Sequence, residues 1–178
     1  MAEKKISRTA RILSIYHLFL YCDEVSIKEI TDQMPEVNPA TAKRDIALLN
    51  RAGVLRSEYS RKANAYIPLS TDIDETYISE SESERENIER IRRLCILMQE
   101  LDEFDMEVEP LHIRIYEKLF PNVKKRTRER DFKALKEIGY IVRRELEYFP
   151  DEDKEKRCYS LAIPNGTYSL PTFHERKW

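Results

Sequence analysis

Apolar residues at helical spacing predict a helix near the start of the chain. The helix covers residues 8–22, with Ser7 before it as an N-cap. Its buried stripe consists of Ile12, Ile15, Tyr16, Phe19 and Leu20. A second helix follows over residues 27–34. Ser26 precedes it and Glu29 lies three residues further on, which is the pattern of a capping box.

A third helix and a hairpin complete the first third of the chain. Asn38 is expected to cap the helix over residues 38–52, with Pro39 at its first position. Gly53 then supplies a left-handed residue that ends the helix. Apolar and β-branched residues predict strands over 54–59 and 65–69, joined by a polar tip.

The second half repeats this order of elements. Helices are predicted over residues 87–103, over 110–120 from Pro110, and over about 125–138, ending before Gly139. Strands over 140–149 and 157–163 form a second hairpin. Between the halves, residues 70–87 are rich in Ser and Glu. This composition indicates a solvated linker or the frayed start of the next helix.

One sequence phrase occurs in both halves. The pattern T-x2-R-D-x3-L-x3-G begins at Thr41 and again at Thr127, 86 residues later. Setting Arg11 against Arg93 also aligns the first helices, at an offset of 82 residues. Each phrase covers a basic helix, a glycine and the start of a strand. That order is typical of a winged helix, in which the helix reads DNA and the hairpin is the wing.

We therefore predict a mainly α protein with small β-hairpins (α+β), built from two tandem winged helix-turn-helix domains. The length of 178 residues allows one or two domains. The expected organisation is a DNA-binding domain over 1–69, an acidic linker over 70–87, a second winged-helix-like domain over 88–163 and a C-terminal tail over 164–178.

Charge is unevenly distributed along the chain. The net charge is −2, but residues 1–69 carry +3 and residues 70–87 carry −6. Residues 124–144 hold 9 Lys and Arg against 3 Asp and Glu. Local positive charge on a helix matters more for nucleic-acid binding than net charge does. The third helix of each half is therefore a candidate DNA contact.

The candidate DNA contacts lie on these two helices and on the first hairpin tip. An α-helix fits the major groove, where Arg can bridge O6 and N7 of guanine, and Thr, Asn and helix N-terminal amides suit phosphates. In the first half the predicted contacts are Asn38, Thr41, Lys43, Arg44, Arg51, Arg61 and Lys62. In the second half they are Arg126, Thr127, Arg130 and Lys133.

A structural interpretation stays open beside the functional one. The repeated Arg-Asp pairs, residues 44–45 and 130–131, could serve only to stabilise the helix ends. The tip of the second hairpin, residues 151–156, carries four acids and two lysines and would repel phosphate. The second half either contacts DNA or mediates dimerisation or partner docking.

One run in the first half matches a family pattern. The residues that carry it are Asn38, Thr41, Arg44, Asp45, Ile46, Leu49, Gly53 and Val54. With Asn38 in place of a capping Ser, this run resembles the helix-turn-helix of DeoR-type and WYL-type bacterial transcriptional regulators. The resemblance covers residues 7–69 and implies DNA binding through Thr41, Lys43 and Arg44, by a dimer on palindromic sites. Beyond it, the chain repeats the winged helix where those families have a sensor domain.

No motif for catalysis, metal binding or cofactor binding is found. The three histidines have no metal-ligand spacing, and no nucleophile elbow, P-loop or dinucleotide fingerprint occurs. Cys22, Cys95 and Cys158 are far apart, as expected of free thiols in a reducing compartment. No run reaches the ~18 apolar residues of a membrane-spanning helix. We expect a cytoplasmic protein that is not an enzyme, needs no cofactor and does not contact a membrane.

These features predict a sequence-specific DNA-binding transcriptional regulator that reads the major groove with residues 38–52. Its expected partner is double-stranded DNA, and a symmetric homodimer is the commonest assembly. Two alternatives stay open. One is a winged-helix interaction or dimerisation module without specific DNA binding, and the other is a tandem winged-helix replication or partition protein. A small-molecule effector also stays open.

Overall fold

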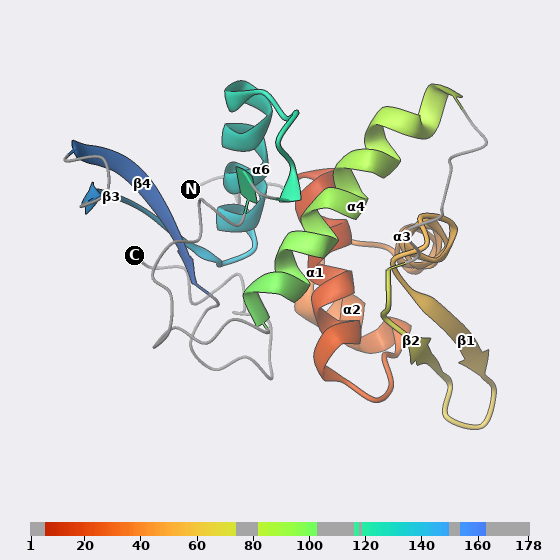
Figure 1. The fold of residues 1–178 in the computed structure, drawn as a ribbon. Coiled ribbons are helices and arrows are strands. Elements are labelled where there is room, and N and C mark those ends of the chain that lie inside the picture. Colours follow the sequence, from red (N-terminus) through yellow and green to blue (C-terminus); the bar gives the residue numbers. More distant parts are fainter. Residues whose placement is uncertain (1–5, 74–81, 103–115, 118, 150–153, 163–178) are drawn as a thin grey trace.

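The computed structural model of the protein describes residues 6–73, 82–102, 116, 117, 119–149 and 154–162. Within these residues the chain is mainly helical, with two separate two-stranded antiparallel sheets (Figure 1). The predicted α+β class is confirmed at this level.

Three helices open the chain, each with the N-cap that the sequence predicts. They are α1 (Arg8–Tyr21), α2 (Ile27–Gln33) and α3 (Pro39–Arg51). The hydroxyl of Ser7 accepts a hydrogen bond from the Ala10 amide, and Ser26 forms a complete capping box with Glu29. Asn38 accepts from the amide of Thr41. Each cap satisfies one of the amides that the first helical turn leaves without an intrahelical partner.

A short hairpin follows α3. Its strands are β1 (Arg56–Ser60) and β2 (Ala65–Ser70), with an irregularity in the register between Arg56 and Ser57. The first strand starts two residues later than predicted, because Val54 and Leu55 are buried in the core where the chain leaves α3. An isolated bridge between Val25 and Tyr66 joins the α1–α2 connection to β2.

The second half contains a long helix, a basic helix and a second hairpin. These are α4 (Glu82–Asp102), α6 (Lys125–Glu137), β3 (Ile141–Phe149) and β4 (Lys154–Ala162). The first of them begins five residues before the predicted start, so part of the Ser/Glu-rich stretch is helical; Glu and Arg favour a helix enough to extend it. The β4 strand begins three residues early because its pairing with β3 continues without a break to Phe149 and Lys154.

Several predicted features lie outside the described residues. They are the start of the second helix of this half at Pro110, the first residues of the acidic hairpin tip, and the tail over 164–178. Tyr116, Glu117 and Leu119, at the end of that predicted helix, are helical. None of the helices in the described part of the chain is long and apolar enough to span a membrane.

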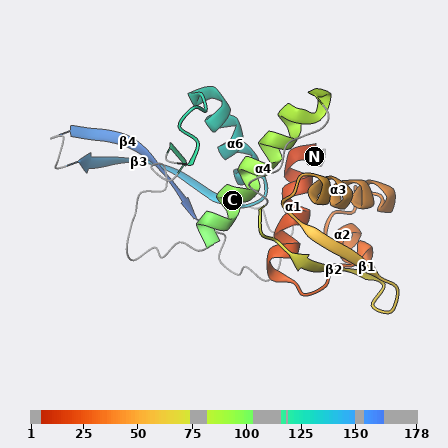
Figure 2. The ribbon, with the colours of Figure 1, turned by 45° about the vertical axis from the view of Figure 1, so that its right-hand side comes forward.

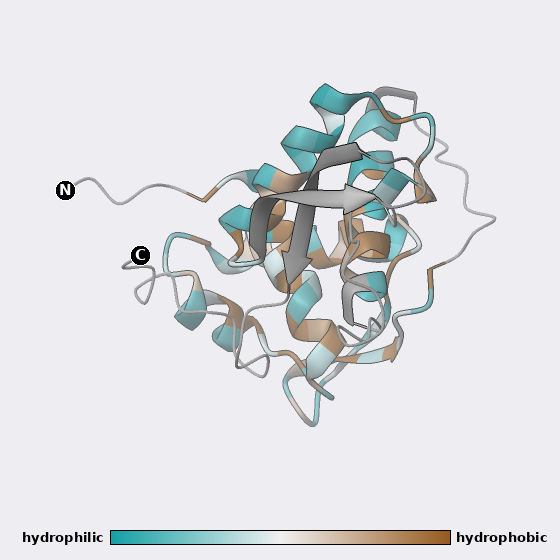
Figure 3. Ribbon diagram, turned by 60° about the vertical axis from the view of Figure 1, so that its left-hand side comes forward, coloured by the Kyte–Doolittle hydropathy of each residue, from teal (hydrophilic) through white to brown (hydrophobic). Residues whose placement is uncertain are grey.

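The hydrophobic core is one cluster with members from both halves. It joins Ile12 and Ile15 of α1 to Ile91 of α4 and Leu135 of α6. Figure 1 shows α1 and α4 crossing at the centre, with α3 and the first hairpin on one side and α6 and the second hairpin on the other, and Figure 2 shows the same arrangement after a turn of 45°. In Figure 3 the apolar stretches of the helices gather in the interior. The two basic helices therefore lie at the periphery of a shared core.

Candidate nucleic-acid interface

The inner face of α3 is held by apolar packing and by one buried ion pair. Ala42, Ile46 and Leu49 are buried at the i, i+4, i+7 spacing of one helix face. Asp45, of which 3% is exposed, faces the same way and binds Arg11 of α1. The distances are 2.5 Å from Arg11 Nε to Oδ2 and 3.2 Å from Nη2 to Oδ1. Asp45 of the repeated phrase therefore fixes the position of α3 on α1. Its burial differs from that of an acid that only stabilises a helix end, which would be exposed to solvent.

The outer face of α3 carries basic side chains. Among its exposed positions are Lys43, Arg44, Ala47 and Arg51, and no exposed position of this helix holds an acid. Leu48, next to Ala47 in the chain, is buried and belongs to the inner face. Successive residues of a helix differ by about 100° in direction, and this places Arg44 on the side opposite the buried Ile46 and Leu49.

Two of the predicted contacts on α3 also have local structural partners. Asn38 is exposed, but its side-chain oxygen is taken by the Thr41 amide at 2.8 Å, and Thr41 itself is half-buried. Arg51 lies 3.8 Å from Glu84 of α4. This pair is exposed and long, so it restrains Arg51 only weakly. Lys43 and Arg44 are the predicted contacts on this helix for which no such partner is seen in the described residues.

Asn50 ties the hairpin to α3, a role that the sequence pattern does not predict. Its amide donates to the carbonyl of Ile46 and to the hydroxyl of Ser57, each at 2.9 Å. Its oxygen accepts from the Ser57 amide at 2.8 Å. A polar residue with low helix propensity, seven residues before a Ser in the following strand, was the available signal. These bonds set the direction in which β1 leaves the helix.

The hairpin tip presents the two predicted basic residues. Arg61 and Lys62 are both exposed in the turn between β1 and β2. Asn64 closes that turn with a positive φ of 53°, and its side-chain oxygen accepts from the Tyr59 hydroxyl at 2.5 Å. The ring of Tyr59 also packs edge-on against Tyr66. The tip is therefore held in shape by its own side chains.

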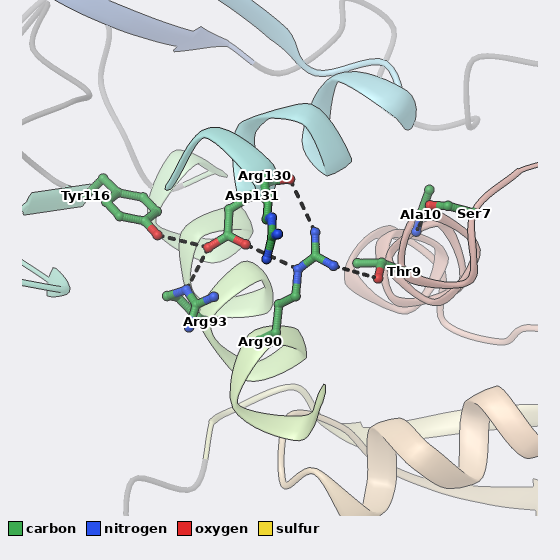
Figure 4. Close-up of polar contacts among 8 residues, drawn as sticks. All are labelled: Ser7, Thr9, Ala10, Arg90, Arg93, Tyr116, Arg130 and Asp131. Atoms are coloured by element: carbon green, nitrogen blue, oxygen red, sulfur yellow. Dashed lines mark hydrogen bonds and ion pairs between the residues drawn. The ribbon is translucent and has the colours of Figure 1, made fainter. Parts of the chain in front are cut away.

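The second basic helix is fixed in the same way as the first. Asp131 of α6 is fully buried, and Arg93 Nε of α4 lies 2.6 Å from its Oδ2. Arg90 Nε is 3.3 Å from Oδ1, and the hydroxyl of Tyr116 donates to Oδ2 at 2.9 Å (Figure 4). The alignment of Arg11 with Arg93 thus corresponds to one ion pair built twice.

The environment of Asp131 shifts the protonation of its partners. Burial lowers the pKa of Arg93, but the hydrogen bond to Asp131 and its charge outweigh burial and raise the pKa overall. Burial raises the pKa of Tyr116, and the charge of Asp131 raises it further. Both shifts keep the protons on the donors, so the cluster stays a set of charge-assisted hydrogen bonds.

The outer face of α6 is basic as well. Arg126, Arg130 and Lys133, all predicted contacts, are exposed, whereas Thr127 is half-buried. Lys124, Lys125 and Lys136 add further exposed positive charge, with Glu129 as the exposed acid of this helix. Unlike α3, this helix has no side-chain hydrogen bond at its N-cap. The Thr127 amide instead donates to the backbone carbonyl of Lys124 at 2.9 Å.

Both helices end in the same backbone motif. Gly53 and Gly139 have positive φ values of 63° and 100°. In each case the following residue donates its amide to a Leu carbonyl five residues back, at 3.3 Å from Val54 to Leu49 and 3.1 Å from Tyr140 to Leu135. This bond is a mark of a Schellman motif, which leads the chain directly into the next strand.

The described residues hold no group of three or more His, Cys, Asp or Glu side chains placed to bind a metal ion. Burial raises the pKa of the Cys95 thiol well above its ordinary value, and burial also raises that of Cys22, which keeps both thiols protonated. Comparisons with protein-family models, curated proteins and solved structures found no match. The resemblance to DeoR-type and WYL-type regulators stays a prediction.

Proposed function

We propose that the protein is a cytoplasmic, sequence-specific DNA-binding transcriptional regulator that reads the major groove with α3. The observation that carries this proposal is the division of that helix into two faces. Its acid, Asp45, is buried in an ion pair, and its exposed positions hold three basic side chains and no acid. A helix with such a face suits the major groove, where guanine accepts two hydrogen bonds from one Arg.

Arg44 is the residue to which the proposal gives base reading. It is exposed, it lies one turn inside the capped N-terminus of α3, and its neighbour Asp45 locks the rotation of the helix. N-terminal residues of a recognition helix commonly contact base edges. The amides of the first turn and Thr41 would then approach phosphates.

The hairpin has the role of a wing in this proposal. Arg61 and Lys62 at its tip would neutralise phosphates without reading sequence. The bonds from Asn50 to Ser57 hold the hairpin at a fixed angle to α3. The order of a basic helix, a glycine and a hairpin recurs in the second half, which supports the finer fold of two tandem winged helix-turn-helix domains.

The salt dependence of duplex binding tests the proposal. Fluorescence anisotropy with a mixed-sequence duplex should give an affinity that falls steeply as salt rises. Lys62→Ala should weaken all sequences alike and reduce the salt slope by about 1. Lys28→Ala is the matched control, because that lysine lies 2.5 Å from Asp32 and its charge is already compensated. Binding that is insensitive to salt, or equal slopes for both variants, would contradict the proposal.

A second candidate function has one observation in its favour. Tyr59 and Leu69 on the first hairpin are large apolar side chains that are 47% and 51% exposed. Exposed apolar residues on one element can mark a protein-docking surface. Under this alternative, Leu69→Ser would abolish partner capture, while neutralising Arg44 and Lys62 would leave it intact.

A further inference from the structure

The two halves of the chain contact each other reciprocally. Glu137, at the end of α6, accepts hydrogen bonds from the amide and hydroxyl of Ser7 at 2.8 and 2.9 Å. Arg51, at the end of α3, lies 3.8 Å from Glu84 near the start of α4. Arg51 and Glu137 occupy the same position in the repeated phrase, 86 residues apart. Each therefore joins the end of its own third helix to the start of the other half's first helix.

The first helices of the two halves also contact each other directly. Arg90 of α4 donates from Nη1 to the hydroxyl of Thr9 on α1 at 3.3 Å (Figure 4). At the offset of 82 residues, Arg90 corresponds to Arg8, the neighbour of Thr9. A contact one position from equivalence, flanked by contacts from the ends of both third helices, is typical of an approximately isologous, two-fold interface. Here the interface joins two halves of one chain.

The basic helices match residue by residue. From 39 to 54 and from 125 to 140, exposed, half-buried and buried positions coincide throughout, with three exceptions. The exceptions are the pairs Ala42 and Arg128, Asn50 and Lys136, and Arg51 and Glu137. Since the ion pair and the glycine end are repeated too, α6 turns equivalent residues inward and outward as α3 does.

We infer that α6 is a second DNA-reading helix, so that one chain binds a bipartite site on one duplex without a second copy. This inference rests on the proposed function of α3. A symmetric dimer of helix-turn-helix proteins supplies two reading helices related by a two-fold axis. Here the approximate two-fold axis between the two halves supplies both reading helices from a single chain. The same axis places the two half-sites of the DNA in inverted orientation.

The two half-sites should differ in sequence. The exposed positions Ala40, Lys43 and Ala47 of α3 correspond to Arg126, Glu129 and Lys133 of α6. Between these positions, Arg44 and Arg130 are equivalent, and both are exposed arginines. Different side chains on the reading face select different base edges. The preferred site is therefore bipartite and not palindromic.

A charge-neutral exchange of the reading face tests this inference. The triple variant Arg126→Ala, Glu129→Lys, Lys133→Ala gives α6 the residues of α3 at the exposed positions 126, 129, 130 and 133 and leaves the net charge unchanged. All three positions are exposed, so the fold should be retained, which circular dichroism and thermal unfolding would check. Sequences bound by the full-length wild type and the variant would be selected from one random duplex pool, and chains per duplex would be counted by native mass spectrometry.

The expected result is two unlike half-sites for the wild type. In the triple variant the second half-site should become an inverted copy of the first, with one chain per duplex in both complexes. Lys133→Ala alone should relax only the second half-site. A wild-type motif confined to one half-site, a second half-site unchanged by the exchange, two chains per duplex, or two duplexes per chain would overturn the inference. Each of these leaves the α3 motif, and the proposed function, standing. Failure to select any motif would overturn both.

Discussion

Arg11 and Asp45 join α1 to α3 through an ion pair with 2.5 Å between Nε and Oδ2. The second half builds the same pair from Arg93 and Asp131, at 2.6 Å between the same atoms. In both halves the acid of the repeated phrase points into the protein and the preceding Arg is exposed. The ion pair thus orients the helix whose outer face we propose to read DNA.

The burial of this ion pair predicts a large loss of stability when it is broken. Asp45→Ala would leave Arg11, which is 18% exposed, without its carboxylate, at a cost of about 3–5 kcal/mol in the free energy of unfolding. Asp32→Ala is the matched control, because Asp32 pairs with Lys28 over the same 2.5 Å in an exposed i,i+4 pair. Chemical denaturation of both variants measures the difference. Equal losses would show that burial of the first pair is not what matters.

The glycines that end the two basic helices predict unequal costs. Gly53 lies at φ 63°, inside the left-handed region that other residues can reach, so Gly53→Ala should cost about 1–2 kcal/mol. Gly139 lies at φ 100°, beyond that region, so Gly139→Ala should cost more. Asn tolerates the left-handed region better than Ala, and Gly53→Asn should be the mildest change. Thermal unfolding of the three variants gives the order, and a Gly139→Ala variant as stable as wild type would refute it.

The caps, the spacing of apolar residues and the repeated phrase made much of the fold predictable. Ser7, Ser26 and Asn38 act as predicted because capping depends only on the residues of one helical turn. The start of α4 was placed too late because a Ser/Glu-rich stretch has no apolar stripe, although it can extend a helix that is anchored further along. Capping residues and apolar spacing predict the helices in which they occur, but they do not predict where an exposed helix begins.

The candidate site was predictable in its residues and only partly in its geometry. The basic side chains of α3 and α6 are exposed, as the helical spacing indicated. The partners of Asp45 and Asp131 lie 34 and 38 residues away, so the sequence placed these acids only on the helix ends. The link from Asn50 to Ser57 depends on how the strand leaves the helix, which no periodicity encodes. Contacts between residues far apart in the sequence are therefore seen only in the structure.

The contact between Ser7 and Glu137 predicts energetic coupling between the two halves. Ser7→Ala, Glu137→Ala and the double variant form a cycle in which the two single losses should not add, with a coupling of about 0.5–1 kcal/mol. The capping bond from Ala10 to Ser7 is lost in both Ser7 variants and cancels from the cycle. Urea unfolding of the four proteins measures it. Because the Ser7 amide keeps its bond to Glu137 in Ser7→Ala, strict additivity would mean that the hydroxyl–carboxylate bond does not couple the halves.

The central claim is that α3 reads a DNA sequence, and selection of bound duplexes from a random pool at about 150 mM salt tests it most directly. Wild type and Lys28→Ala should enrich the same motif. Arg44→Ala should lose about 1–3 kcal/mol of binding free energy and accept other bases at one position of that motif. A wild type that enriches no motif, or an Arg44→Ala variant that selects an unchanged one with unchanged affinity, would contradict the assignment of α3 as the reading helix.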